Sequence, residues 1–202
     1  MSGRPAAQVL DRLGGAAEVF GLHGAERGRA GRVELDPEAA RFAPLMAEVL
    51  SEARTEVEHL GLPGVVVEDK GVIVALHHRA AADQQAAATA LERLAADLAA
   101  RYGLERASGR KVIELRPPLR FSKAKVITAE ARRRALAAAA FAGDDMVDLP
   151  AFDALDELAA AGLATVRIAV ASAEAPPELL ARADVVVAGP TELLDLLATL
   201  LD

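Results

Sequence analysis

The spacing of apolar residues predicts two long amphipathic helices in the first half of the chain. Between residues 37 and 60 the apolar side chains recur at steps of three and four, the pattern of one helix of about 24 residues with a single apolar face. The residues of that face are Phe42, Leu45, Met46, Val49, Ala53, Val57 and Leu60. Asp36 is placed to cap this helix, with Pro37 in its first turn. A second helix is predicted over residues 82–102 and ends at Gly103.

Shorter apolar segments near these helices predict strands. Residues 6–14 indicate a short helix, and residues 17–22 indicate a strand. Residues 65–76 are rich in β-branched side chains around Asp69-Lys70-Gly71, which is typical of a β-hairpin. Two further short strands flank Ser108-Gly109. We therefore expect residues 30–116 to form an α+β module with antiparallel strands.

The second half of the chain alternates strands and helices. Helices are predicted over residues 123–136, 149–161, 176–183 and 190–201, and strands over 137–142, 165–170 and 184–187. This alternation is typical of a doubly wound parallel sheet. The predicted fold class is α/β, with a core formed by residues 1–29 and 117–202 and an α+β insert, residues 30–116, between them.

Composition narrows the classes of function. The 202 residues carry a net charge of −7, whereas nucleic-acid-binding proteins usually present a basic face. The sequence has no cysteine, no apolar run long enough to span a membrane, and no apolar signal-peptide core after Met1. We expect a cytoplasmic monomer that acts on a small molecule, without nucleic-acid or membrane partners.

Three carboxylates follow the strand predicted at residues 137–142. Asp144, Asp145 and Asp148 come directly after Gly143, and ligands of open α/β sheets bind beyond the carboxyl ends of strands. Carboxylate oxygens suit Mg²⁺, which also takes water and substrate phosphate as ligands. The alternative is that these residues only cap the next helix, for which one aspartate is sufficient. The cluster favours a metal-binding loop.

The spacing Gly-Asp-Asp-x-x-Asp at residues 143–148 resembles the fourth motif of haloacid-dehalogenase-type phosphatases. The resemblance implies that Asp144 binds Mg²⁺ and that Asp148 and Asp145 assist through water or by orienting neighbours. Family members often have Glu after the last Asp, where this chain has Leu149.

Lys123 is the candidate for the lysine that these phosphatases carry upstream of the metal-binding loop. Its neighbours are Ser122 and Ala124, where the family has Asp-Lys-Gly, and Lys125 is a rival. By position alone, a solvated surface lysine is the better interpretation. The resemblance instead implies that Lys123 balances charge between the phosphate and the carboxylates.

Two other segments resemble the trehalose-phosphate branch of this superfamily. Ser2-Gly3-Arg4-Pro5 is similar to the second motif, in which Ser2 would hydrogen-bond the phosphoryl group and Arg4 would assist. Residues 67–71, 75–79 and 112–117 resemble its substrate-reading cap. The resemblance makes Glu68, Lys70 and Glu114 candidate contacts to the sugar, with His23 and Arg79 as weaker ones. Without it, an exposed cross-strand ion pair is the better interpretation of Glu68 and Lys70.

The reaction of the family begins at an Asp-x-Asp motif, whose first carboxylate is the nucleophile and whose second is the general acid. No two aspartates of this sequence are two positions apart. We expect that the chain starts after this motif, through an internal start codon or a truncated gene. We also expect that it lacks the first core strand and is unstable alone. The DNA upstream of the Met1 codon tests this expectation.

Three functions follow from these observations. The first is Mg²⁺-dependent hydrolysis of trehalose 6-phosphate, with this chain inactive without the nucleophile. The second is hydrolysis of another sugar phosphate. The third is non-catalytic binding of a sugar phosphate, which retained cap residues and a missing nucleophile would both permit.

Overall fold

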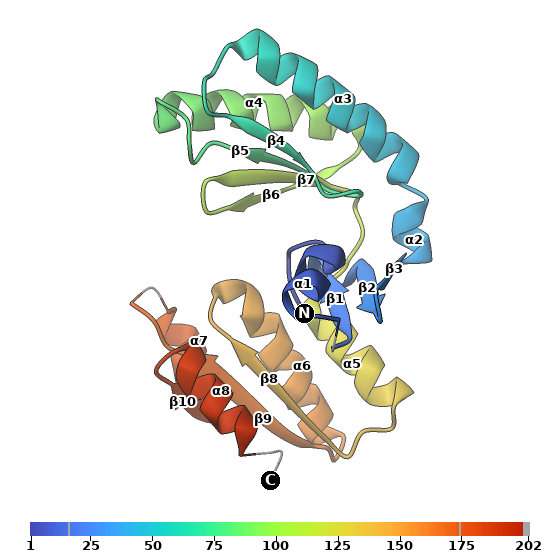
Figure 1. The fold of residues 1–202 in the computed structure, drawn as a ribbon, viewed down its shortest axis with the longest axis vertical. Helices are drawn as coiled ribbons and strands as arrows, with labels where there is room; N and C mark the ends of the chain where they lie inside the picture. The colour runs from blue at the N-terminus through green and yellow to red at the C-terminus, as the bar shows by residue number, and fades with distance from the viewer. Residues whose placement is uncertain (16, 174, 200–202) are drawn as a thin grey trace. The chain divides into compact units, whose positions relative to one another are not determined.

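The computed structural model describes residues 1–15, 17–173 and 175–199. The chain divides into two compact units, Met1–Arg120 and Phe121–Asp202 (Figure 1). The predicted pairing of residues 1–29 with residues 117–202 in one core stays a prediction.

The first unit begins with a helix on a small antiparallel sheet. Helix α1 (Ala6–Arg12) contacts strands β1 (Val19–Gly21), β2 (Glu26–Arg29) and β3 (Arg32–Leu35), which pair in the order β1-β2-β3. A Cβ on Gly28 would lie 2.7 Å from a Leu10 methyl carbon, so glycine allows the helix to approach the sheet. The sequence predicted β1 but neither β2 nor β3.

The single helix predicted over residues 37–60 is wrong, because the structure has two. Helix α2 (Pro37–Ala40) ends before α3 (Ala43–Leu60) begins. Pro44 has no amide hydrogen for the Ala40 carbonyl, and its ring would clash with that carbonyl in a continuous helix. The apolar positions nevertheless share one face, since Met46, Val49, Leu50 and Ala53 are all buried.

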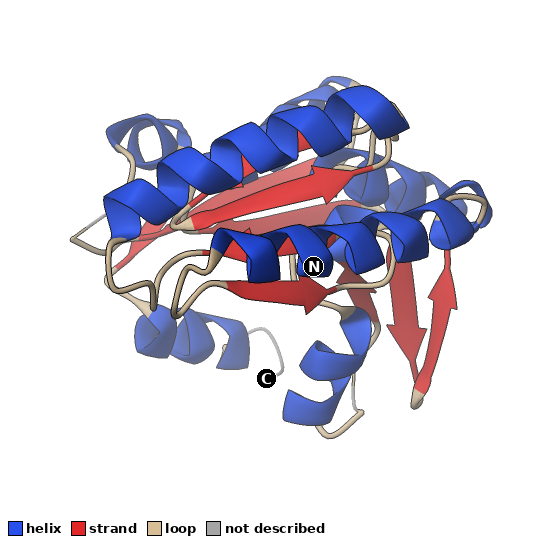
Figure 2. Cartoon of the chain, turned by 90° about the horizontal axis from the view of Figure 1, so that it is seen from above, coloured by secondary structure: helices blue, strands red, loops and turns tan. Residues whose placement is uncertain are grey.

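The rest of the first unit is built on a four-stranded antiparallel sheet. Its strands are β4 (Val66–Asp69), β5 (Val74–His77), β6 (Glu105–Gly109) and β7 (Val112–Arg116), in the order β4-β5-β7-β6. Helix α3 and helix α4 (Gln84–Tyr102) cover one face (Figures 1 and 2). The core includes Val74, Leu76, Ile113 and Leu115 from the strands and Leu91, Ala95 and Leu98 from α4. Since side chains alternate along a strand, Glu68, Ala75 and Glu114 lie on the other face of the sheet.

The second unit has the predicted parallel sheet, in the order β10-β9-β8. Its elements are α5 (Lys123–Arg133), β8 (Ala138–Gly143), the 3-10 turn η2 (Met146–Asp148), α6 (Leu149–Ala160), β9 (Ala164–Val170), α7 (Pro177–Arg182), β10 (Val185–Val187) and α8 (Pro190–Ala198). Leu155 and Leu158 of α6 pack with Ala131 of α5, and Phe152 packs with Ala169 of β9. The predicted last helix extended to residue 201, which lies outside the described residues. None of the helices described combines the length and apolar character that a membrane-spanning segment needs.

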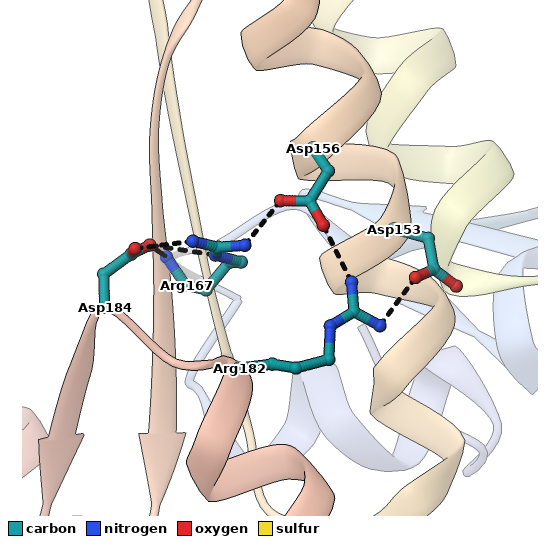
Figure 3. Close-up of polar contacts among 5 residues, drawn as sticks. All are labelled: Asp153, Asp156, Arg167, Arg182 and Asp184. Atoms are coloured by element: carbon teal, nitrogen blue, oxygen red, sulfur yellow. Dashed lines mark hydrogen bonds and ion pairs between the residues drawn. The ribbon is translucent and has the colours of Figure 1, made fainter.

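Five charged side chains connect α6, β9, α7 and the start of β10 (Figure 3). Arg167 donates to Asp184 at 2.6 Å and to Asp156 at 2.6 Å. Arg182 donates to Asp156 at 2.8 Å and to Asp153 at 2.7 Å. The hydrogen bonds from the Arg167 side chain, followed by one from its backbone amide, lower the pKa of Asp184 to about 2.

Candidate functional site

The Asp148 carboxylate organises the acidic loop after β8. Only 2% of Asp148 is exposed, and it is the one charged residue buried to this degree among the described residues. Its Oδ2 accepts from the amides of Asp144 at 3.0 Å and Asp145 at 3.3 Å. Gly143 allows this packing, because a Cβ there would lie 2.5 Å from the Asp148 Cβ. The loop is therefore folded around one buried carboxylate.

Lys123 neutralises that carboxylate. The Ser122 hydroxyl accepts from the Lys125 amide and caps α5, which places Lys123 in the first turn of the helix. The Lys123 ammonium donates to Asp148 Oδ1, and its nitrogen lies 5.8 Å from the centre of the Phe141 ring. A buried carboxylate requires a cation of this kind. The structure thus brings Lys123 to the acidic loop, and its role toward a phosphate stays a prediction.

The rival lysine lies elsewhere on α5. Lys125 lines a groove of about 490 Å³ between α5 and α6, together with Ala129, Pro150 and Asp153. Its backbone serves the Ser122 cap, and its side chain faces the groove instead of Asp148. The geometry favours Lys123 over Lys125 as the lysine of the acidic loop.

The three aspartates differ in how they could serve a metal ion. Asp148 is occupied by three donors, and the Asp145 side chain accepts from the Met146 amide at 2.6 Å as a helix cap. Asp144 is exposed, and within the described residues no hydrogen bond or ion pair occupies its carboxylate. No group of three or more His, Asp or Glu side chains in the described part of the chain could hold a metal ion by itself. The donor set fits Mg²⁺, which takes one or two protein carboxylates and completes its shell with water and phosphate.

The cap candidates gather on the helix-free face of the four-stranded sheet. Glu68 and Glu114 both lie opposite Ala75 of β5, one on each side. The Lys70 ammonium lies 2.7 Å from Glu114 Oε1 and 3.8 Å from Glu68 Oε2. All three side chains predicted to contact the sugar therefore form one cluster.

His77 belongs to the same cluster, although it was not among the residues predicted to contact the sugar. Its Nε2 lies 2.7 Å from Glu68 Oε2. The signal was present in the alternation of β5, since His77 is two positions from Ala75 and so shares its face. The cluster has one lysine, one histidine and two carboxylates.

Ser2 and Arg4 lie beside the small N-terminal sheet. The Ser2 amide donates to Phe20 O at 2.8 Å, and the His23 amide donates to Ser2 O at 3.0 Å. The Ser2 hydroxyl accepts from the Arg4 amide at 3.0 Å, and Arg4 is exposed. Gly21 permits this arrangement, because a Cβ there would lie 2.3 Å from the Ala6 nitrogen.

The weaker candidates lie in two different places. A Cβ on Gly3 would approach the His23 ring to 2.9 Å, so His23 packs against the N-terminal segment. Arg79 donates to Arg110 O at 3.4 Å, beyond the end of β5. Neither residue joins the Glu68–Lys70–Glu114–His77 cluster through a hydrogen bond or ion pair that the structure shows.

A family model for trehalose-phosphatase matches residues 1–182. The chain belongs to the trehalose-phosphatase family. Among relatives, a "Trehalose-phosphate phosphatase" of Mycolicibacterium paratuberculosis is 36% identical over 163 residues, 77% of this chain and 40% of that protein. A "Probable trehalose-phosphate phosphatase" of Sinorhizobium fredii is 36% identical over 149 residues, 69% of this chain and 51% of that protein. The aligned part of this trehalose-phosphatase family member thus spans about half or less of the length of these relatives.

Solved structures show the same fold for this member of the trehalose-phosphatase family. A "trehalose-6-phosphate phosphatase related protein" matches 99% of this chain and 79% of its own with a TM-score of 0.78 and 23% identity. A haloacid dehalogenase-like hydrolase from Bacteroides thetaiotaomicron matches 92% of this chain and 78% of its own with a TM-score of 0.58 and 14% identity. The fold is a haloacid-dehalogenase-like core with a cap, as the sequence predicted.

Proposed function

We propose that this chain provides the metal, phosphate and sugar contacts of a trehalose-6-phosphate phosphatase, which hydrolyses trehalose 6-phosphate to trehalose and phosphate. The observation that carries the proposal is the buried Asp148–Lys123 pair beneath the exposed Asp144 carboxylate, in a chain that matches the trehalose-phosphatase family over residues 1–182. Burying a charged pair is costly, so its position directly after β8 supports a role beyond capping.

Each residue of the acidic loop would have a different role in binding the phosphate. Asp144 would hold Mg²⁺, which supplies positive charge to a phosphoryl group when bound. Asp148 holds the Asp144 and Asp145 amides and fixes the Lys123 ammonium at the loop. Lys123 would balance the charge of the phosphate, while Asp145 caps η2 and assists less directly.

By the family resemblance, the N-terminal candidates Ser2 and Arg4 would donate to a phosphoryl group. The Ser2 hydroxyl accepts from the Arg4 amide and keeps its own proton for a phosphoryl oxygen. Arg4 is exposed and carries a planar guanidinium, a group that matches phosphate geometry.

The cluster on the four-stranded sheet would recognise the sugar. Within the cluster, Glu68 is bound through Oε2 and Glu114 through Oε1. Each carboxylate retains a second oxygen that can accept a hydrogen bond from a sugar hydroxyl. The Lys70 ammonium can donate to a hydroxyl oxygen. Paired acceptors around a donor suit a polyol such as a disaccharide.

These residues supply neither the nucleophile nor the general acid of the family's reaction. No two aspartates of the sequence have the Asp-x-Asp spacing. We propose that the 202-residue chain alone does not hydrolyse trehalose 6-phosphate and that hydrolysis requires an Asp-x-Asp segment in addition.

The test joins this chain to the Asp-x-Asp segment of the Mycolicibacterium paratuberculosis relative and measures phosphate release. We expect Mg²⁺-dependent release from trehalose 6-phosphate, little from sucrose 6-phosphate or glucose 6-phosphate, and none from the 202 residues alone. Asp144→Asn and Lys123→Met should abolish release, whereas Lys125→Met, the matched control, should not. Release that favours another sugar phosphate would replace the substrate assignment.

Non-catalytic binding of a sugar phosphate is the second candidate, and the lack of an Asp-x-Asp pair in a chain with a complete cap cluster favours it. Calorimetry of the 202-residue chain with trehalose 6-phosphate and with trehalose tests it. Heat with either ligand supports binding without catalysis, and no heat with both rejects it.

A further inference from the structure

The side chains of the cap cluster are arranged as a chain of contacts that ends at His77. His77 contacts Glu68 at 2.7 Å, Lys70 lies 3.8 Å from the same Glu68 oxygen, and Lys70 contacts Glu114 at 2.7 Å. Lys70 and Glu114 are largely covered, with 12% and 14% of their side chains exposed. His77 and Glu68 are more open to solvent, with 34% and 33% of their side chains exposed.

The register explains why His77 can reach Glu68. Glu68 lies directly opposite Ala75, and His77 lies opposite Val66, so His77 and Glu68 are diagonal neighbours on one face. Diagonal neighbours of an antiparallel pair lie within reach of aromatic and long side chains. Ala75 between the two carboxylates is small and leaves the diagonal open.

The chemistry of the contact fixes the proton. An ionised carboxylate only accepts hydrogen bonds, so the proton between His77 and Glu68 is on Nε2. Glu68 Oε2 is thereby occupied, and Glu68 Oε1 is left for a ligand.

We propose that His77 is a positioning residue that holds the Glu68 carboxylate away from Lys70 so that the cluster can bind the sugar. Without this donor, the Glu68 oxygen 3.8 Å from Lys70 closes onto the ammonium and draws it from Glu114. The two carboxylates and the ammonium then pair with one another. The hydroxyl groups of the sugar therefore lose their hydrogen-bond partners. This inference rests on the proposed recognition of a sugar by Glu68, Lys70 and Glu114.

A merely structural role makes a different prediction. A hydrogen bond between two side chains that are each about one-third exposed contributes little to the free energy of unfolding. Its loss should leave stability almost unchanged, whereas loss of positioning should weaken sugar binding.

Two substitutions separate the donor position from ring size. The side-chain amide of Gln places its nitrogen near the location of Nε2, whereas that of Asn is shorter by one carbon. His77→Gln therefore keeps the donor and His77→Asn removes it. Trehalose binding to the 202-residue chain and both variants is measured by calorimetry, and melting temperature by circular dichroism. We expect His77→Asn to bind about tenfold more weakly, the loss of one hydrogen bond to a charged group, and His77→Gln to bind within about twofold of the wild type.

The possible outcomes separate the two proposals. If the wild type binds trehalose and His77→Asn binds it with equal affinity, the role of His77 is overturned and the sugar assignment stays intact. Equal weakening in both variants with a lower melting temperature also overturns it, because the effect would then be structural. If the wild type binds no trehalose while the His77 Nε2 proton exchanges slowly by NMR and Glu68→Ala speeds that exchange, the sugar assignment fails and the inference fails with it.

Discussion

The Asp148→Asn substitution tests the organisation of the acidic loop. Asn keeps the size of Asp148 and one carbonyl oxygen for the amides of Asp144 and Asp145. It removes the negative charge that the Lys123 ammonium requires. Asp148 is 2% exposed, so water cannot replace the lost charge.

The expected loss of stability is about 3 kcal/mol. Breaking a buried ion pair by removing one partner costs about 3–5 kcal/mol, because the other charge is left uncompensated. The lower end applies because the Asn oxygen still accepts from the two loop amides, and because Lys123 can turn partly toward solvent. The chain has no tryptophan and one tyrosine, so urea unfolding is followed by circular dichroism.

Asp145→Asn is the matched control. Asp145 is exposed and caps η2 through the Met146 amide, so its substitution should cost about 1 kcal/mol or less. Hydrogen exchange of the Asp144 and Asp145 amides adds a local measurement, and we expect faster exchange in Asp148→Asn. A loss below about 1 kcal/mol with unchanged exchange would refute the reasoning that a buried charged pair organises this loop.

Three more substitutions test the packing and charges of each unit by urea unfolding. Gly143→Ala should destabilise by about 1–3 kcal/mol, since its Cβ would lie 2.5 Å from the Asp148 Cβ; an unchanged midpoint would show that the loop relaxes freely. Leu76→Ala should cost about 2–5 kcal/mol, whereas the control Leu194→Ala, at a side chain 65% exposed, should cost under about 0.5; equal losses would contradict the assigned core. The lowered pKa of Asp184 means that its carboxylate stabilises the fold above its usual pKa of 3.8 and stops doing so as the pH falls to about 2. The stability difference between wild type and Asp184→Asn should therefore be at most about 1 kcal/mol at neutral pH, since the side chain is well exposed, and should vanish near pH 2; a difference independent of pH would contradict the assignment.

Much of the fold follows from local signals in the sequence. The alternation after residue 121 predicted the parallel sheet because each strand is a short apolar run and each helix has its own start signal, such as Ser122 or Pro190. The long helices of the first unit were predicted because their apolar spacing reflects the face that packs on the sheet.

The missed strands have a physical explanation. Strands β2 and β3 contain charged residues and Gly28, so their composition resembles a loop. Their turn, Ala30-Gly31, has positive φ at both residues, 49° and 76°. Asn-Gly is the usual sequence for a turn of this geometry, and Ala at its first position gives no such signal. The strands form because β2 pairs with β1, β3 pairs with β2, and α1 packs on them, and a short stretch of sequence does not reveal these tertiary contacts.

The candidate site was predicted as residue types but not as contacts. Spacing in the sequence indicated the acidic loop, yet only burial shows that Asp148 is the organiser and Asp144 the exposed carboxylate. The choice between Lys123 and Lys125 likewise depended on which ammonium reaches Asp148. The alternation of β5 places His77 on the same face as Ala75, but its contact with Glu68 depends on the register of β4 and β5.

The most direct test of the account is calorimetry of trehalose 6-phosphate binding to the 202-residue chain with and without Mg²⁺, in the wild type and in Asp144→Asn. We predict that Mg²⁺ strengthens binding of the wild type at least tenfold and has no effect on Asp144→Asn. Binding that is the same with and without Mg²⁺ in the wild type would contradict the claim that this loop presents a metal ion to a phosphorylated sugar.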